Sequence, residues 1–353
     1  DDGLALLEVA VPRLGDDASA VAESQVARAL LLHTRSRYPE AAALARAALR
    51  YARQRKDARL RRSSLFMLGQ ASVAMGHYAS AAHCHRESLE LARAEGNGNG
   101  IAGGLAMLSD LAIVDGRHDE AIAYARRSLE QQARNGVVHA DTISSLALAL
   151  HRVGRHAEAD EQFARAHALL PRREGGIQPA SCAYHEALAA FERGDLARAQ
   201  ACAERAREAV ALGGEPAYEA ALPLLLSGIA LRQHHGALAL HHLQRGLGTA
   251  RELHMQWLLL AGLVQGAHWL LENGDAGCAA AVLRTALAAR GLRAVDREQA
   301  RVLFDRSMAT PAGTATAAPA SVDDAIAWLL ALRADARSVA ADVGVHHAVR
   351  VSG

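Results

Sequence analysis

Residues Gly69–Arg134 read GQASVAMGHYASAAHCHRESLELARAEGNGNGIAGGLAMLSDLAIVDGRHDEAIAYARRSLEQQAR, and this stretch contains two near-copies of one pattern. The segments GHYASAAHCHRESLELAR (Gly76–Arg93) and GRHDEAIAYARRSLEQQAR (Gly116–Arg134) begin forty residues apart. Each follows a segment of small and apolar residues. The repeated unit is therefore predicted to be a helix, a glycine-containing turn and a second helix. A fixed period of this length is typical of a solenoid.

The same turn recurs along the chain. A glycine at this position can end the first helix in a left-handed conformation, with φ above zero. The residue five positions later is alanine in six of the seven units and Leu240 in the sixth, so the second helix can pack closely on the first. We therefore expect seven repeats of about forty residues over 19–290, with an irregular sixth repeat. The predicted turn residues are Ser36, Gly76, Gly116, Gly154, Gly194, His235 and Gly274.

Both ends depart from the repeat. Residues 1–18 are expected to be either an N-terminal cap helix or half of a further repeat, which would make the chain part of a longer protein. Residues 291–353 are expected to hold capping helices joined by a Pro/Ala/Thr linker at 310–320. Ser321 and Asp324 form a capping box before an apolar stripe, so this last helix is predicted to fold back as the C-terminal cap. The expected fold class is all-α, a right-handed α-solenoid.

Composition and charge argue against several kinds of partner. The chain has 39 basic and 38 acidic residues and a net charge of +1, which does not favour nucleic-acid binding. The most basic run, KDARLRR at Lys56–Arg62, is interpreted as a solvated helix end. No stretch of about 18 uncharged apolar residues is present, so no membrane span is expected. The four cysteines form no CxxC pair and are expected to be reduced thiols in the cytoplasm.

The repeat resembles the tetratricopeptide repeat (TPR). The residues that carry the resemblance are Gly76, Tyr78, Ala81 and Ser88-Leu89, with their counterparts Gly116, His118, Ala121 and Ser128-Leu129. In such arrays the first helix of each repeat lines a concave inner surface, so the resemblance implies a groove there.

A narrower likeness lies in the loop Glu95–Ala102 and in the two tail helices, REQARVLFDRSMA and VDDAIAWLLAL. These segments resemble the TPR-like arrays of large bacterial ATP-dependent regulators, including LuxR-type, SARP-type and maltose-activator-type transcriptional regulators. The resemblance implies a repeat domain that senses a ligand or partner and restrains an ATPase module of the same polypeptide. No GxxxxGK[ST] motif occurs in this chain, so it is not expected to bind ATP itself.

No motif for catalysis, a cofactor or a metal is convincing. Gly98–Gly103 matches GxGxxG, but it follows a predicted helix rather than a strand and is interpreted as an inter-repeat loop. His83 and His85 flank Cys84, yet they point about 200° apart on a helix and cannot share one tetrahedral ion. No nucleophile motif such as GxSxG is present. The chain is predicted not to be an enzyme and to hold no cofactor or metal.

The predicted groove is the candidate site. Apolar contact and sparse polar groups suit a protein or peptide segment, or a small effector. Arg152 and Arg232 could each hold a carboxylate in a bidentate way. The predicted groove residues are Gln70, Asp110, His151, Arg152, Tyr184, Phe191, Glu192, Arg232, Gln233, His268 and Glu272. Their apolar neighbours on the same face are predicted to be Phe66, Val73, Ile113, Leu148, Leu188, Ile229 and Val264.

Two alternatives to a regulator's sensor domain stay open. The chain could be a stand-alone scaffold that assembles other proteins, or an accessory subunit of an enzyme. An ATP-binding module upstream in the same gene would favour the sensor, and an intact polar N-terminal cap would favour the scaffold. A homodimer is also possible, because exposed terminal repeats can stack end to end.

The Gly116→Val variant tests the predicted turn. A β-branched residue resists φ above zero, and strain in a left-handed conformation costs about 1–2 kcal/mol. We expect the variant to melt several degrees below the wild type in a thermal scan followed by circular dichroism. An unchanged melting curve would mean that the turn lies elsewhere.

Overall fold

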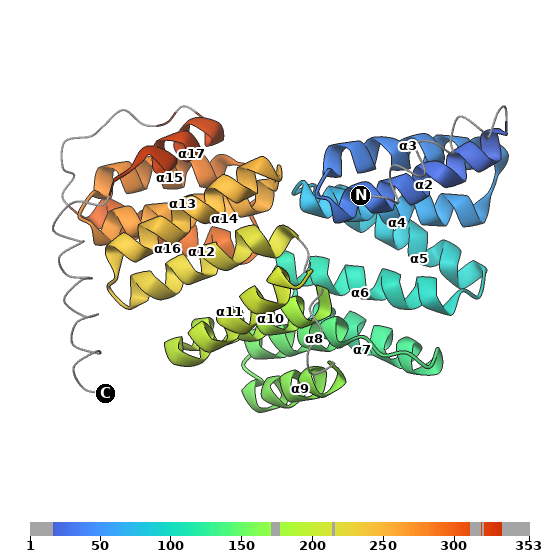
Figure 1. Ribbon diagram of the computed structural model, residues 1–353, viewed down its shortest axis with the longest axis horizontal. Coiled ribbons are helices and arrows are strands. Elements are labelled where there is room, and N and C mark those ends of the chain that lie inside the picture. Colours follow the sequence, from blue (N-terminus) through green and yellow to red (C-terminus); the bar gives the residue numbers. More distant parts are fainter. Residues whose placement is uncertain (1–16, 171–176, 214–215, 311–318, 320, 334–353) are drawn as a thin grey trace. The chain divides into compact units, whose positions relative to one another are not determined.

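The computed structural model of the chain describes residues 17–170, 177–213, 216–310, 319 and 321–333. These residues form helices and turns without a strand (Figure 1). Nearly all of the half-repeat or cap helix predicted at 1–18 lies outside the described residues. So does most of the linker predicted at 310–320.

The helices of the described residues pair into seven hairpins, which confirms the all-α repeat fold (Figure 1). The first helices of the repeats are α2 (Ala18–Thr34), α4 (Ala58–Ala74), α6 (Gly98–Val114), α8 (Ala140–Arg152), α10 (Ile177–Arg193), α12 (Pro216–Arg232) and α14 (Gln256–Glu272). The second helices are α3 (Tyr38–Arg55), α5 (Tyr78–Ala94), α7 (His118–Arg134), α9 (His156–Leu169), α11 (Leu196–Ala211), α13 (Gly236–Glu252) and α15 (Ala276–Ala288). Two further helices follow, α16 (Ala294–Ala309) and α17 (Val322–Ala331).

The chain divides into two compact units, residues 1–174 and 175–353. The first unit contains α2 to α9, and the second contains α10 to α17. From α2 to α9 and from α10 to α16, each helix packs on the next helix of its unit. First helices also contact the first helices of the next repeat, as α2 does with α4, α6 with α8, α10 with α12, and α12 with α14. This layering makes each unit a stack of hairpins, as the sequence period predicts.

The turn between the two helices of a hairpin has the predicted left-handed backbone. Gly76 and Gly116 both have φ of 74°, and Ser36 takes φ of 58° without being a glycine. In the sixth repeat the left-handed residue is His234, with φ of 61°, whereas the predicted turn residue His235 has φ of −92°. The prediction was wrong by one residue because two adjacent histidines occupy the turn and neither is a glycine.

This shift restores the sixth repeat to the common pattern. With His234 as the turn residue, the residue five positions later is Ala239 rather than Leu240, and Ala239 is 0% exposed. Every hairpin therefore has a buried alanine at this position. The seven alanines are Ala41, Ala81, Ala121, Ala159, Ala199, Ala239 and Ala279.

A small residue also stands seven positions before each turn residue, where it faces the alanine across the hairpin. Two serines show how close the backbones are at this crossing. The Ser109 hydroxyl donates to the Ala121 carbonyl at 2.9 Å, and the Ser227 hydroxyl donates to the Ala239 carbonyl at 2.8 Å. A larger side chain at either place would separate the helices. The seven small residues are Ala29, Gly69, Ser109, Ala147, Ala187, Ser227 and Ala267.

A second close approach lies nearer the open end of the hairpin. The Ser88 hydroxyl donates to the Arg62 carbonyl at 3.1 Å, and the Ser128 hydroxyl donates to the Ala102 carbonyl at 2.8 Å. Gly246 occupies the same place in the sixth repeat, where a Cβ would lie 3.1 Å from the Ala220 carbonyl oxygen. Two crossings hold the helices of a hairpin at a fixed angle and prevent one from sliding along the other.

His85 takes up the space that the missing side chain of Gly69 leaves. A Cβ on Gly69 would lie 2.6 Å from the His85 ring, and the ring of Phe66 packs edge-on against it at 5.5 Å. His85 is 0% exposed, and this burial lowers its pKa to about 4. Cys84 is buried as well, whereas His83 is exposed. The sequence HCH is thus part of the core packing.

α17 is the C-terminal cap of the second unit. It contacts α13, α14 and α15, and its Leu329 inserts where Gly266 has no side chain. The Gln244 side-chain amide donates to the carbonyls of its last turn, at 3.2 Å to Leu329 and 2.8 Å to Leu332. At the other end, the Ser321 hydroxyl accepts from the Asp324 backbone N–H at 3.1 Å. The predicted fold-back helix is confirmed, with both ends capped.

Glycine at position 234 tests the corrected turn. His234→Gly removes the cost of a left-handed non-glycine residue, and we expect a gain of about 0.5–1 kcal/mol after the entropic cost of glycine. The melting temperature should rise by a few degrees. The control is His241→Gly, which removes an exposed histidine within α13 and should lower stability by a few tenths of a kcal/mol. A decrease in both variants would contradict the turn assignment.

Candidate binding surface on the first helices

The eleven predicted groove residues all lie on first helices, except Gln233, which follows the end of α12. Those of the first unit are Gln70 on α4, Asp110 on α6, and His151 and Arg152 in the last turn of α8. Those of the second unit are Tyr184, Phe191 and Glu192 on α10, Arg232 at the end of α12, Gln233, and His268 and Glu272 on α14. Their role in binding stays a prediction.

The face of α6 and α8 carries a pair of acidic side chains. The Asp110 carboxyl of α6 is hydrogen-bonded to the Ser145 hydroxyl of α8 and lies near the Asp141 carboxylate. The pKa of Asp110 is raised to about 7: burial is the largest cause, the Ser145 hydrogen bond opposes it, and the Asp141 charge adds to it. Asp110 therefore changes between carboxylic acid and carboxylate near neutral pH. It can donate or accept a hydrogen bond accordingly.

His151 is more buried than a side chain that contacts a ligand in a groove is expected to be. It is 6% exposed, and its Nδ1 lies 3.1 Å from Nδ1 of His156 at the start of α9. Arg152, the next residue, is half-buried. On α4, Gln70 is half-buried, and its backbone is hydrogen-bonded to the imidazole of His33 on α2. Burial lowers the pKa of His33, and this hydrogen bond partly offsets the effect.

Aromatic side chains join α10 to α12 in the second unit. Tyr184 is 8% exposed, and its ring lies 5.3 Å from that of Tyr218. Phe191 packs where Gly228 has no side chain, since a Cβ there would lie 2.9 Å from the Phe191 ring. The Arg232 guanidinium stacks on Phe191 at 4.0 Å and donates to its backbone carbonyl at 2.5 Å. These contacts give Arg232 a structural role alongside the predicted carboxylate binding.

Charged groups continue from Arg232 along α14 and α16. The Arg306 guanidinium of α16 donates to Glu272 of α14 at 2.7 Å, and His268 Nε2 lies 3.6 Å from the same carboxylate. Burial lowers the pKa of His268, the Glu272 charge raises it, and the charges of Arg306 and Arg232 lower it again. Burial lowers the pKa of Arg232, and the charge of the exposed Glu192 partly offsets this effect.

Several side chains were placed or omitted wrongly from the sequence. Four of the apolar neighbours predicted on this face are buried in the core, because they lie between helices; these are Ile113, Leu148, Ile229 and Val264. Asp141, Ser145 and Arg306 contact predicted residues but were missed. The repeat period could have identified Ser145. It stands nine residues before its turn residue, Gly154, and Gln265 stands nine residues before Gly274. Gln265 also contacts the preceding first helix, at Gly228.

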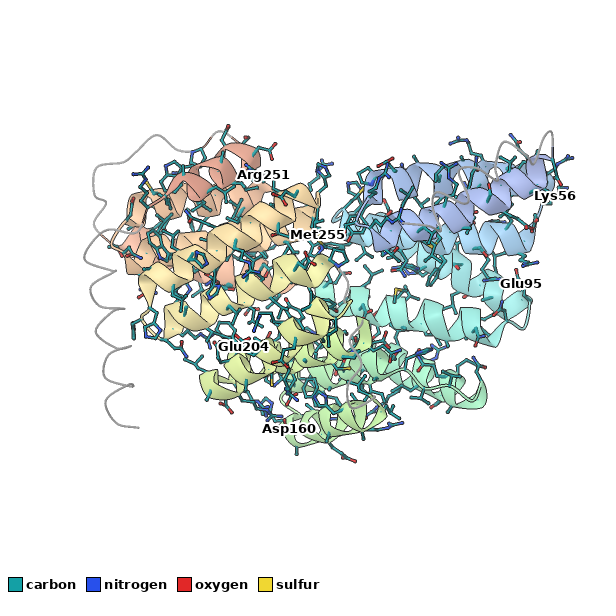
Figure 2. All side chains as sticks on the ribbon, viewed as in Figure 1. Lys56, Glu95, Asp160, Glu204, Arg251 and Met255 are labelled. Carbon is teal, nitrogen blue, oxygen red and sulfur yellow. The ribbon has the colours of Figure 1, made fainter. Side chains whose placement is uncertain are left out.

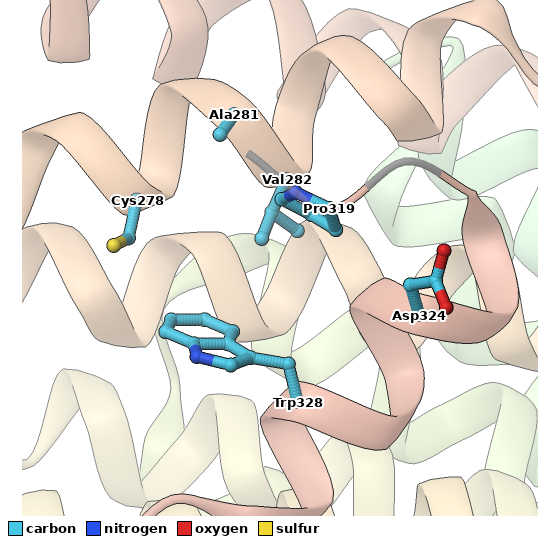
Figure 3. Close-up of a pocket in the computed structure, with 6 residues that line it drawn as sticks. All are labelled: Cys278, Ala281, Val282, Pro319, Asp324 and Trp328. Carbon is cyan, nitrogen blue, oxygen red and sulfur yellow. The ribbon is translucent and has the colours of Figure 1, made fainter. Parts of the chain in front are cut away.

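A small cavity lies elsewhere in the second unit, between α15 and α17. It has a volume of ≈ 210 Å³, and the Trp328 indole of α17 lies beside it (Figure 3). No predicted groove residue borders it, and its walls are mostly apolar. The lining residues are Cys278, Ala281, Val282, Pro319, Asp324 and Trp328.

The described residues offer little metal or thiol chemistry. They contain no group of three or more histidine, cysteine or acidic side chains that could hold a metal ion. Cys84, Cys182, Cys202 and Cys278 are buried thiols. Burial raises the pKa of the Cys202 thiol, which keeps it from acting as a thiolate near neutral pH. None of the helices in the described part of the chain has the length and apolar character that a membrane span needs.

Comparison with solved structures shows likenesses in fold. A solved chain, "Crystal structure of APC/C hetero-tetramer Cut9-Hcn1", superposes with a TM-score of 0.48 at 15% sequence identity. The likeness covers 85% of this chain and 59% of the solved one, so this chain spans less than two thirds of that protein's length. No protein-family model matches the sequence, and no curated protein matches it.

Asp110→Asn tests the acidic pair. The pKa of Asp110 is about 7 in the folded chain and 3.8 as a model value. As pH rises above about 4, the unfolded chain releases this proton first, so folding stability is lost progressively up to about pH 7. We expect Asp110→Asn to be about 1–3 kcal/mol more stable than wild type at pH 8, an estimate reduced for partial solvent contact.

The advantage of Asp110→Asn should vanish near pH 4, where both forms of the side chain are neutral. Chemical unfolding at pH 4, 6 and 8 measures the difference. Asp305→Asn, at an exposed carboxylate on α16, is the control and should show no such dependence. A constant difference at all three pH values would contradict the raised pKa.

Proposed function

We propose that the chain binds an extended segment of a partner protein along the first helices of its second unit. The observation that carries this proposal is the row of groups with both charge signs, Glu192, Arg232, His268, Glu272 and Arg306, which crosses four successive first-helix positions. Phe191 supplies an aromatic surface at one end. Such a mixture suits recognition of a polypeptide, in which apolar contact gives area and polar groups determine alignment.

Helix spacing supports a polypeptide ligand. Packed helices lie about 8–10 Å apart, so the row offers a polar contact at that interval. An extended chain rises about 3.3 Å per residue and would meet one such contact about every third residue. A small effector is the weaker candidate. The cavity between α15 and α17, at ≈ 210 Å³, is below the size of ordinary ligand pockets, about 300–1,000 Å³. A hollow of ≈ 340 Å³ between α15 and the end of α16 reaches that size, but its lining holds no charged side chain that could orient a ligand.

At a finer level, we propose that the chain is the sensor part of a bacterial ATP-dependent transcriptional regulator and acts in the cytoplasm. This proposal rests on the sequence resemblance of the loop Glu95–Ala102 and of the two tail helices. Partner binding would then change the restraint on an ATPase module of the same polypeptide. Co-purification of such a module with this chain would support the proposal, and a gene without one would contradict it.

The test uses the purified chain as bait in a bacterial lysate, followed by mass spectrometry and a binding titration of each protein recovered. The variant Glu192→Gln/Arg306→Ala removes one charge of each sign from the row and leaves the net charge unchanged. We expect its affinity for the recovered protein to fall at least tenfold. Arg232→Ala is unsuitable, because Arg232 also joins α10 to α12.

The matched control is Glu208→Gln/Arg251→Ala, which removes two exposed charges from the second helices α11 and α13. It should bind as the wild type does, and both variants should melt within a few degrees of it. Equal affinity for the row variant and the wild type would contradict binding at this surface. A metabolite released on denaturation, without a protein partner, would favour an effector instead.

A further inference from the structure

The positive charge of the chain is concentrated in one short segment. Residues 46–62 contain eight basic residues and one acidic residue, so this segment carries a net charge of +7. Because the whole chain carries +1, the remaining residues carry −6. The single acid of the segment, Asp57, is committed to capping α4, where it accepts from the Leu60 backbone N–H at 2.9 Å. Nothing within the segment neutralises its charge.

The basic side chains lie on α3, on the turn that leads to α4, in the first turn of α4, and on the neighbouring α5. Arg46, Arg50 and Arg53 stand at i, i+4 and i+7 on α3 and therefore share one face. Arg46 and Arg53 both act on the Cys84 thiol of α5, where their charges oppose the larger effect of burial on its pKa. Lys56 occupies the tip of the turn (Figure 2). We call this surface the basic ridge, made of Arg46, Arg50, Arg53, Arg55, Lys56, Arg59 and Arg86.

Most of the ridge has no acidic partner. All seven side chains are exposed. Within the part of the chain that the structure describes, only Arg53 pairs with a carboxylate, Glu87, at 3.4 Å. Glu87 also forms an ion pair with Arg61 at 2.5 Å, so two arginines share this carboxylate. Like charges held so close repel each other and are stabilised by an anionic ligand.

The geometry of the guanidinium group favours a planar oxyanion such as a carboxylate at this surface. Arginine binds carboxylates in a planar, bidentate way, as Arg37 does with Glu40 through two hydrogen bonds of 2.6 Å. Along α3 the step from Arg46 to Arg50 rises about 6 Å, close to the roughly 6.6 Å between alternate side chains of an extended peptide. An acidic peptide can therefore meet successive arginines with every second residue.

Nucleic acid is the less favoured ligand, because base stacking needs aromatic platforms. Tyr51 is the aromatic residue of segment 46–62, and it is covered by the Arg55 guanidinium at 5.8 Å. We propose that the basic ridge is a second docking surface, on the second helices of the first unit, for an acidic segment of a partner protein. It is distinct from the first-helix row described above.

The test measures fluorescence anisotropy of a labelled twelve-residue peptide of alternating Glu and Ser, with the full chain at 50 mM NaCl. We expect saturable binding that weakens at least tenfold at 300 mM NaCl, because salt screens charge pairs. The variant Arg46→Glu/Arg50→Glu/Arg86→Glu should lower the affinity at least tenfold. Should it fail to fold by circular dichroism, the milder Arg→Gln triple at the same positions replaces it and should give a smaller loss.

The matched control, Arg127→Glu/Arg134→Glu/Arg284→Glu, makes the same charge change at exposed arginines outside the ridge. It should retain wild-type affinity, as should Glu192→Gln/Arg306→Ala, which separates this test from that of the first-helix row. Equal weakening by the ridge and control triples would overturn the proposal in favour of long-range attraction. Tighter binding of a dT12 oligonucleotide, or of phosphatidylserine vesicles, than of the peptide would overturn the choice of an acidic protein segment.

Discussion

The close crossing of the two helices in each hairpin is the constraint on which the rest of the structure depends. A buried alanine five residues after the turn meets a small residue seven residues before it, and the serine hydroxyls of Ser109 and Ser227 span the gap to the opposite backbone. This approach requires a short turn, which in turn requires a left-handed residue. The forty-residue period thus follows from one packing contact repeated along the chain.

The crossing also determines which side chains can act as ligands. It buries one side of each helix and leaves the others to contact neighbouring repeats or solvent. In the second unit the contacts between successive first helices bring Arg232, His268 and Arg306 into one row. In the first unit the outer side of α3 presents arginines that the core does not use. Both surfaces arise because side chains recur at equivalent positions of successive helices, and neither surface is a closed pocket.

The sequence predicts the hairpins, most of the turns and the C-terminal cap, because these depend on local signals such as glycine, alanine and the Ser321–Asp324 box. The sixth turn was displaced by one residue, since His234 adopts a conformation that usually indicates glycine. Side-chain burial was harder to predict. His151, Tyr184 and Ile229 stand on the predicted face but pack between helices, which depends on tertiary contacts. The raised pKa of Asp110 likewise arises from burial and from the charge of Asp141, about thirty residues away.

The two close approaches seen in the third and sixth hairpins have a mechanical consequence. Two helices whose backbones touch at two points behave as a single stiff plate, because bending would have to break both approaches at once. Some contacts between consecutive hairpins run through longer side chains, such as Arg53 of α3 to Glu87 of α5 at 3.4 Å, and can adjust by rotation about single bonds. Elastic deformation within each unit should therefore concentrate at the joints between plates. Each unit would then respond to a pulling force mainly by opening at these joints.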